Sequence, residues 1–221
     1  MNNSAFFINP WSPVVSKAQL ADLEQIVVSH LSDNLQRMSG ICGLQRIHRS
    51  KKLVGTAFTV KVRPGDNLLI YKALTLLKPG HVLVVDGAGH PTNALVGELI
   101  MLYAQQRGCA GFVIDAAVRD TNAFYEADFP CYARAVSHRG PYKNGPGQIN
   151  VPVAVGGQVI SPGDVVVGDE DGIVSFPLQD LEKIVEAARK THAHEEKIKA
   201  EIANGKIEQE WLTKVLAPFD L

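Results

Sequence analysis

The sequence has few cysteines and no excess of charge of either sign. Its three cysteines, Cys42, Cys109 and Cys131, are odd in number and far apart in a chain of 221 residues. They predict buried thiols in a reducing compartment such as the cytoplasm, not a disulfide framework. Without a CxxC pair, a zinc–cysteine site is not expected. The formal net charge is −1, so no basic excess attracts a phosphate backbone, and general nucleic-acid binding is not expected.

Long apolar runs and a targeting segment are also missing. No apolar stretch reaches the roughly 18 residues that a membrane span requires. The N-terminal sequence MNNSAFFINPW has neither the basic nor the apolar region of a secretory signal, so no membrane association is expected. Apolar residues nevertheless make up 46% of the chain and charged residues 20%, which is the composition of a folded globular protein.

Hydrophobic periodicity predicts a helix near each end of the chain. Between about residues 16 and 38, apolar side chains recur at spacings of three and four, and Ser16 precedes them as a candidate N-cap. Residues 178–203 have the pattern of a long, charged amphipathic helix that stops at Asn204-Gly205. A shorter helix is expected over 207–216.

The segments between these helices predict a parallel β-sheet. Leu53–Val62 is β-branched and roughly alternating, which predicts a strand, and Asp66 can cap a helix after it. His81–Asp86 and Gly111–Asp115 are short apolar runs, and residues 93–107 between them have helical periodicity. Strand, helix and strand in this order form a βαβ unit whose two strands are parallel.

Residues 131–177 are rich in glycine, proline and short β-branched runs. Gly156-Gly157 and Asp171-Gly172 are typical of hairpin turns. Because no polar linker separates this region from the preceding one, we expect its strands to join the first sheet. The sequence therefore predicts one α/β domain over residues 1–221, with a βαβ core and additional β-hairpins.

Two places in this domain follow strands and could bind a ligand. The loop Gly87–Pro91 leads toward the predicted helix, and free backbone N–H groups there suit a carboxylate or phosphate; a structural turn explains the loop as well. Arg119-Asp120 follow the second parallel strand, where open α/β sheets place ligands. The guanidinium can hold an anionic oxygen and the carboxylate a divalent cation, although a local ion pair or a helix cap also accounts for them.

Glu98 is a third candidate. One helix and one strand separate it from Arg119, a path that returns the chain to the same end of the sheet, so the two side chains could converge. A solvated helix glutamate is the alternative. The histidines offer less: His192 and His194 face different directions on a predicted helix, and His90 stands alone in the glycine loop. No GxSxG motif and no lysine in an apolar strand supports a serine hydrolase or a Schiff-base enzyme.

Three segments, taken in order, resemble one known family: VVDGAGHPTNALVGEL, GFVIDAAVRD and QINVPVAVGGQVISPGDVVVGDEDGIVSFP. They are similar to the class II pyruvate aldolases that cleave 4-hydroxy-4-methyl-2-oxoglutarate. That family also contains the RraA-like proteins that regulate ribonuclease E. VGTAFTVKVRPGDNL resembles its N-terminal part, and the similarity extends from about Gly40 to about Gly205. The resemblance implies a swivelling β/β/α-type fold that assembles as a homotrimer or a hexamer.

The resemblance also assigns roles to residues. The aldolase branch has an acidic residue, twenty intervening residues and then Arg-Asp; here Glu98 is followed by Arg119-Asp120, with Glu where aldolases often have Asp. It implies that Asp120 holds Mg²⁺ or Mn²⁺ directly and that Glu98 holds it through water. Arg119 would bind the keto oxygen of the substrate.

Other parts of the implied site come from the backbone and from a neighbouring subunit. Backbone amides around Gly97 and Leu99 would bind the substrate carboxylate, and Asn67 would line the pocket. A glutamate from the C-terminal helix of a neighbour, Glu195 or Glu196, would complete the outer shell of the metal. The repeating charges of that helix leave both choices open.

These assignments imply a metal-dependent carbon–carbon lyase that releases pyruvate from a 4-hydroxy-2-oxo acid. The enolate left by cleavage needs cations placed beforehand, which Arg119 and the metal would supply, and a water held by Glu98 could take the hydroxyl proton. Because decarboxylation of oxaloacetate gives the same enolate, it is expected as a side activity.

Two alternatives stay open on the same fold. One is a non-catalytic RraA-like regulator that binds a ribonuclease or another protein. The other is a different enzyme that uses metal–enolate chemistry on another 2-oxo acid. The ribonuclease-regulating branch tends to lack the Asp after the Arg, and this chain retains Asp120, which favours catalysis.

Overall fold

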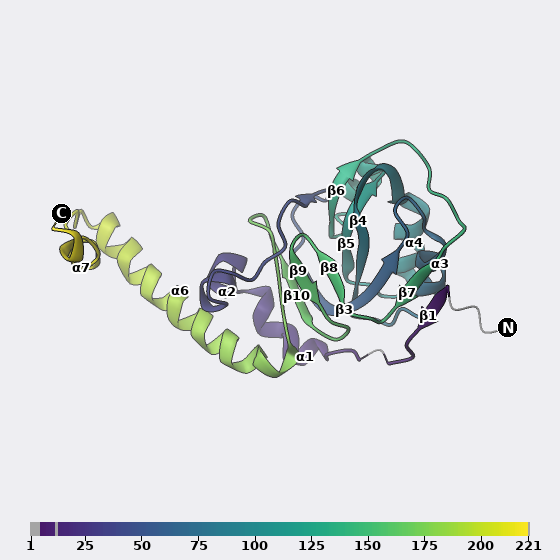
Figure 1. Cartoon of the computed structure of the whole chain (residues 1–221). Coiled ribbons are helices and arrows are strands. Elements are labelled where there is room, and N and C mark those ends of the chain that lie inside the picture. The colour runs from purple at the N-terminus through teal and green to yellow at the C-terminus, as the bar shows by residue number, and fades with distance from the viewer. Residues whose placement is uncertain (1–4, 12, 221) are drawn as a thin grey trace.

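A mixed β-sheet forms the centre of the protein (Figure 1). The structure is a computed structural model and describes residues 5–11 and 13–220. Four neighbouring strands of this sheet are parallel: β3 (Leu53–Val62), β4 (His81–Val96), β5 (Gly111–Val118) and β6 (Cys131–Val136). The predicted strand over 53–62 and the parallel pairing on either side of the βα crossover are confirmed.

Shorter strands extend this sheet on both sides. They are β1 (Phe6–Ile8), β2 (Gln45–Arg46), β7 (Gly147–Ile149), β10 (Val165–Gly168) and β11 (Ile173–Phe176). β10 pairs with β3 and with β11, both antiparallel, and β11 forms an edge. β8 (Val153–Val155) and β9 (Gln158–Ile160) form a separate antiparallel hairpin. The two predicted hairpin turns are therefore confirmed, but the expectation that the strands of residues 131–177 join the first sheet is wrong for β8 and β9, which pair only with each other.

Helices cover one face of the parallel strands. They are α3 (Leu68–Leu74), α4 (Glu98–Gln106) and α5 (Thr121–Glu126). Alternate residues of the strands, such as Phe58, Leu83 and Phe112, pack beneath these helices and are fully buried. Residues of the other parity, such as Val84 and Val113, pack against the β8–β9 hairpin. Burial of both faces explains why these strands are almost continuously apolar.

The continuous helix expected over 16–38 is wrong. The chain instead forms α1 (Lys17–Leu20), a 3₁₀ turn over Ala21–Glu24, and α2 (Val28–Asn34). Ser16 does cap α1, in a capping box with Gln19. The break comes before Val28, whose N–H donates to Asp169 Oδ2 at 2.7 Å. A carboxylate from the β10–β11 turn thus starts a new helix, which local periodicity could not reveal.

The loop and helix expected over 87–107 also differ from the structure. Gly87–Pro91 do not leave the sheet, because β4 continues to Val96 with several shifts of register against β5. Gly87 permits this path, since a Cβ there would lie 2.8 Å from the Cβ of Ala116. The helix α4 therefore begins at Glu98 rather than Asn93. The helix terminus that could bind an anion consequently lies at Gly97–Leu99, not at the glycine loop.

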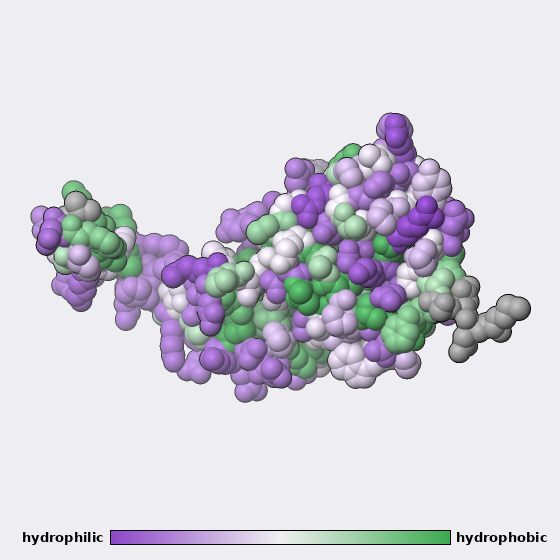
Figure 2. Space-filling view, viewed as in Figure 1, coloured by the Kyte–Doolittle hydropathy of each residue, from purple (hydrophilic) through white to green (hydrophobic). Residues whose placement is uncertain are grey.

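The C-terminal helix α6 (Leu181–Ala203) follows a 3₁₀ turn over Leu178–Asp180 and ends at Asn204, as predicted. Its first turns bury Leu181, Ile184 and Val185 against the N-terminal helices and the β10–β11 hairpin. Beyond them it extends away from the sheet to the short helix α7 (Glu210–Leu216) (Figure 1), where apolar side chains gather on the surface (Figure 2). Among the described residues, no helix is long and apolar enough to cross a membrane.

The cysteine prediction is confirmed for two of the three residues. All three thiols are free, and Cys109 and Cys131 are buried. Burial raises the pKa of the Cys109 thiol to about 11, so it stays protonated near neutral pH. Cys42, expected to be buried, is exposed; it lies in the connection between α2 and β2, outside the packed layers.

Candidate functional site

A pocket of about 170 Å³ opens where β5 ends and α4 begins. Six residues singled out from the sequence line it: Asn67, Gly97, Glu98, Leu99, Arg119 and Asp120. The remaining lining residues are Tyr71, Ala94, Leu95, Val96, Ile100, Pro141 and Lys143. The convergence of Glu98 with Arg119-Asp120, expected from the path of the chain, is therefore present. Glu195 and Glu196 lie on α6 and do not line the pocket of their own chain.

Asp120 is held in a defined position at the rim of this pocket. It adopts a left-handed backbone conformation, with φ of 55°, between β5 and α5. Its Oδ2 accepts a hydrogen bond from Glu98 N–H at 3.1 Å and lies 3.6 Å from Arg119 Nε. Both charged side chains are about half exposed. A carboxylate at the positive end of α4 is electrostatically favourable, and it keeps a second oxygen for a ligand.

Gly97 provides the space that Asp120 occupies. A Cβ at this position would overlap Asp120 Oδ2 and would lie 3.0 Å from Arg119 Cγ. The backbone of Gly97 is extended, with φ of −154°, which any residue can adopt. Glycine is thus needed here for room and not for its conformational freedom.

The first turn of α4 presents backbone amides to the pocket. The first N–H groups of a helix have no intrahelical acceptor, and the helix dipole favours an anion there. The carboxylate of Asp120 already accepts a hydrogen bond from the N–H of Glu98. The amides that remain for a ligand are therefore those of Leu99 and Ile100, both of which line the pocket. The side chain of Leu99 itself is 81% exposed.

Asn67 contributes a buried acceptor. Its side chain is 2% exposed, and its Nδ2 donates to Leu95 O at 2.9 Å. Its Oδ1 is buried without a hydrogen-bond partner among the described residues. Buried polar atoms are rarely left unpaired, so an unpaired oxygen beside a pocket suits a hydroxyl or water of a bound ligand.

Lys143 is a lining residue that the sequence analysis missed. It lies in the loop after β6, with its Nζ 5.8 Å from the centre of the Tyr71 ring. Asp66 fixes this loop: its Oδ2 accepts from the N–H groups of Asn144 at 2.6 Å and Gly145 at 3.0 Å. These contacts join segments nearly 80 residues apart, so no local pattern reveals them.

We expect Asp66→Asn to lower the free energy of unfolding by about 2 kcal/mol, because an amide NH₂ would face backbone donors in a site that is 1% exposed. Urea denaturation of both proteins measures this difference. Asp171→Asn, in the exposed β10–β11 turn, is the matched control and should have no measurable effect. Equal stability of all three proteins would show that Asp66 does not secure the loop.

No histidine in the described part of the chain lines this pocket. His90 Nε2 lies 3.1 Å from Asn93 Oδ1, and His90 does not line the pocket. His30, for which the sequence suggests no partner, does have one. It is 5% exposed, its Nε2 lies 2.9 Å from Glu195 Oε2, and its ring centre is 5.5 Å from that of His192.

The two candidate glutamates of α6 consequently differ in structure. Glu195 bonds to buried His30, whereas Glu196 pairs with exposed Lys199 at 2.8 Å. We expect Glu195→Ala to lower the free energy of unfolding by about 1 kcal/mol, because it removes the partner of a buried imidazole. Glu196→Ala, the matched control, should leave stability unchanged. If both variants unfold at the same denaturant concentration, the Glu195–His30 contact does not stabilise the junction of α2 and α6.

The side chains of the pocket suit a divalent ion that has few protein ligands. Within residues 5–11 and 13–220, no group of three or more His, Cys, Asp or Glu side chains is placed to hold a metal. The pocket offers Asp120 and Glu98, and Mg²⁺ is commonly bound through one or two carboxylates with several waters and the substrate. The residues therefore fit Mg²⁺ or Mn²⁺ held largely by water, and they do not fit a structural zinc.

Comparisons with known proteins agree on one family. The RraA-like family model, described as Aldolase/RraA, matches residues 28–175, from α2 to β11. The chain is 36% identical over 186 residues to a protein of Halalkalibacterium halodurans named "Putative 4-hydroxy-4-methyl-2-oxoglutarate aldolase". The match covers 82% of this chain and 89% of that protein.

Solved structures share the fold. RraAS2 of Streptomyces coelicolor, described as an unusual member of the RNase ES inhibitor RraA protein family, is 26% identical with a TM-score of 0.78; the match covers 86% of this chain and 99% of that one. The RNA-processing inhibitor RraA of Thermus thermophilis is 30% identical with a TM-score of 0.64, over 69% of this chain and 93% of that one. Names of both kinds, aldolase and RNA-processing inhibitor, thus occur among proteins similar to this chain.

Proposed function

Since the chain belongs to the RraA-like (Aldolase/RraA) family, we propose that it is a divalent-metal-dependent lyase. It cleaves 4-hydroxy-4-methyl-2-oxoglutarate, or a close 4-hydroxy-2-oxo acid, and releases pyruvate. The observation that carries this proposal is the convergence of Arg119, Asp120 and Glu98 on one small pocket at a helix N-terminus. The three free thiols favour a reducing compartment such as the cytoplasm.

Substrate binding follows from the charges that line the pocket. The pyruvyl carboxylate lies at the N–H groups of Leu99 and Ile100, where the helix terminus favours an anion. Arg119 donates to the keto oxygen next to it. Lys143, on the opposite loop, is available for a second carboxylate of the substrate, and Asn67 Oδ1 can accept a hydrogen bond from its hydroxyl group.

A divalent metal would be held by the free oxygen of Asp120 directly and by Glu98 through water. When bound there, Mg²⁺ or Mn²⁺ would act as a Lewis acid that stabilises developing negative charge. We further propose that the protein is a homo-oligomer, a trimer or hexamer, in which α6 of a neighbour supplies an outer-shell glutamate. Glu196 suits this role better than Glu195, because only Glu195 is bound to a histidine of its own chain.

Bond cleavage then needs a proton acceptor and a stabilised enolate. The Glu98 carboxylate is exposed at the first residue of α4 and can take the proton of the substrate hydroxyl through a water. As the carbon–carbon bond breaks, negative charge develops on the oxygen that Arg119 faces, and this preorganised cation lowers the barrier. Oxaloacetate yields the same enolate by loss of CO₂, so the same residues should decarboxylate it.

A second candidate function is regulation of an RNA-processing enzyme, because two similar structures carry that description. The two functions are separated by assaying pyruvate release from 4-hydroxy-4-methyl-2-oxoglutarate and from oxaloacetate, beside inhibition of a purified ribonuclease E. Release of pyruvate from both acids supports the lyase. Inhibition of the ribonuclease without turnover of any 2-oxo acid would instead support the regulator.

A further inference from the structure

The loop that follows β6, residues 137–146, forms one wall of the pocket at Asp120, and we call it the wall loop. Its Pro141 and Lys143 line the pocket. Neither residue lies in a helix or a strand, so the position of the Lys143 ammonium group depends on the contacts that hold the backbone of the loop.

The second half of the wall loop is held by the segment between β3 and α3. Asp66 accepts hydrogen bonds from two of its N–H groups, as described above. The N–H of Tyr142 donates to Gly65 O at 2.8 Å, and Tyr142 O accepts from the N–H of Asn67 at 3.0 Å. These contacts fix the backbone on both sides of Lys143.

The first half of the wall loop is held by the end of β4. The N–H of Ala94 donates to Arg139 O at 2.8 Å. One residue before Ala94, the Nδ2 group of Asn93 donates to Gly140 O at 2.7 Å. Asn93 thus provides a side-chain contact that holds the loop directly before Pro141.

His90 fixes the orientation of the Asn93 amide. Because Asn93 Nδ2 is used at Gly140, the atom that faces the imidazole is Oδ1, which lies 3.1 Å from His90 Nε2. The Nε2–H of His90 therefore donates to this oxygen. The hydroxyl of Thr92 donates to the same oxygen at 3.2 Å. The histidine of the glycine-rich segment consequently acts on the pocket through Asn93 and not by contact with a ligand.

We propose that Asn93, oriented by His90, is a positioning residue that holds Lys143 where it binds the second carboxylate of a dicarboxylic 2-oxo acid. This inference rests on the proposed lyase function and narrows its substrate class to acids with a second carboxylate. The ring of Tyr71 also lines the pocket, and its centre lies 5.8 Å from Lys143 Nζ. An aromatic face at this distance favours a cation there.

Steady-state kinetics with oxaloacetate test the positioning role. Lys143→Met should raise the KM about tenfold, because it removes a charged partner of the second carboxylate. Asn93→Ala should raise it about fivefold, and kcat should stay within about twofold of the wild type in both variants, since binding is lost equally before and during the reaction. The double variant should behave as Lys143→Met does, because Asn93 acts through Lys143.

A substrate with one carboxylate separates positioning from general damage to the site. For 4-hydroxy-2-oxopentanoate, which has no anion for Lys143, Lys143→Met and Asn93→Ala should both keep the KM of the wild type.

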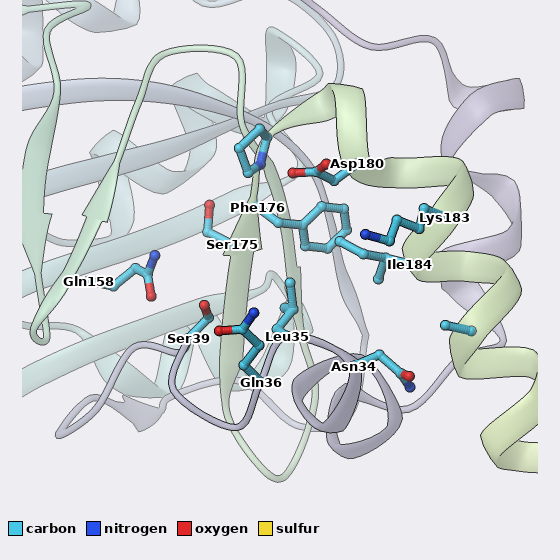
Figure 3. Close-up of a pocket in the computed structure, with 12 residues that line it drawn as sticks. Asn34, Leu35, Gln36, Ser39, Gln158, Ser175, Phe176, Asp180, Lys183 and Ile184 are labelled. Carbon is cyan, nitrogen blue, oxygen red and sulfur yellow. The ribbon is translucent and has the colours of Figure 1, made fainter.

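Gln158→Ala is the matched control. Gln158 is another amide that holds loop backbone, since its Oε1 accepts from Gly40 N–H at 2.9 Å. It lines a separate hollow between the end of α2, β11 and α6, which shares no lining residue with the pocket at Asp120 (Figure 3). This variant should have the kinetics of the wild type with both substrates.

Hydrogen exchange followed by NMR tests the wall loop without any turnover. The amide of Tyr142 should exchange about tenfold faster in Asn93→Ala than in the wild type, because a loop with fewer contacts opens more often. His90→Phe should change it in the same direction but less, and Gln158→Ala should leave it unchanged. If the wild-type protein releases pyruvate from no 2-oxo acid, the proposed lyase function is wrong, and the exchange rate still decides whether Asn93 holds the loop.

Two results would overturn the proposal. Unchanged exchange of the Tyr142 amide in Asn93→Ala would show that Asn93 does not hold the wall loop. An equal rise of the KM for oxaloacetate and for 4-hydroxy-2-oxopentanoate would show that the loss does not occur at the second carboxylate, so that Asn93 does not act through Lys143.

Discussion

Purified Asp120→Asn protein is expected to fold normally, and its kcat/KM for pyruvate release is expected to fall by about 1,000-fold or more. Asparagine tolerates the left-handed backbone at this position, and its Oδ1 can still accept from Glu98 N–H. The substitution thus removes the negative charge that would hold the metal and little else. Steady-state assays with saturating Mg²⁺ measure the loss, and circular dichroism checks the fold.

Asp171→Asn is the matched control, since it removes a carboxylate from an exposed turn far along the chain from the pocket. It should retain activity within about twofold of the wild type. Activity of Asp120→Asn within tenfold of the wild type would mean that this carboxylate does not hold the metal.

Gly97→Ala should be nearly as damaging, although it removes no functional group. The added Cβ overlaps Asp120 Oδ2 and crowds Arg119, so both side chains must move from the positions that they share at the pocket. We expect kcat/KM to fall by about 100-fold or more. Because the extended backbone of Gly97 accepts alanine, the unfolding transition should remain cooperative.

Gly140→Ala controls for an added methyl group in the same neighbourhood. A Cβ at Gly140 meets only Arg119 Nη1, at an ordinary contact distance of 3.6 Å. That variant should keep activity within about threefold of the wild type. Equal activities of the two variants would show that the close approach of Gly97 to Asp120 has no part in the reaction.

Much of the fold could be predicted from local pattern. The strand Leu53–Val62, the end of α6 at Asn204 and the hairpins at Gly156-Gly157 and Asp171-Gly172 all agree with the structure. Each depends on periodicity or on turn residues that act over a few positions. The chain order of strands and helices likewise predicted that Glu98 and Arg119-Asp120 meet.

The predictions from sequence are wrong where contacts between residues far apart in the chain determine the local structure. The N-terminal helix breaks because Asp169, more than 140 residues away, accepts the N–H of Val28. The helix α4 begins at Glu98 rather than at Asn93 because β4, despite its shifts of register, stays paired with β5 as far as Val96. Lys143 joins the pocket only because Asp66 binds the backbone of Asn144 and Gly145. None of these contacts has a signal within a local window of sequence.

The proposed reaction depends above all on a metal at Asp120. The most direct test measures the initial rate of pyruvate release from 4-hydroxy-4-methyl-2-oxoglutarate by metal-free protein, first in excess EDTA and then after addition of Mg²⁺ or Mn²⁺. We predict no release in EDTA above the uncatalysed rate, and full recovery when the metal is in excess of the chelator. Undiminished release in EDTA, or none with either metal, would contradict the assignment of this pocket as a metal-dependent lyase site.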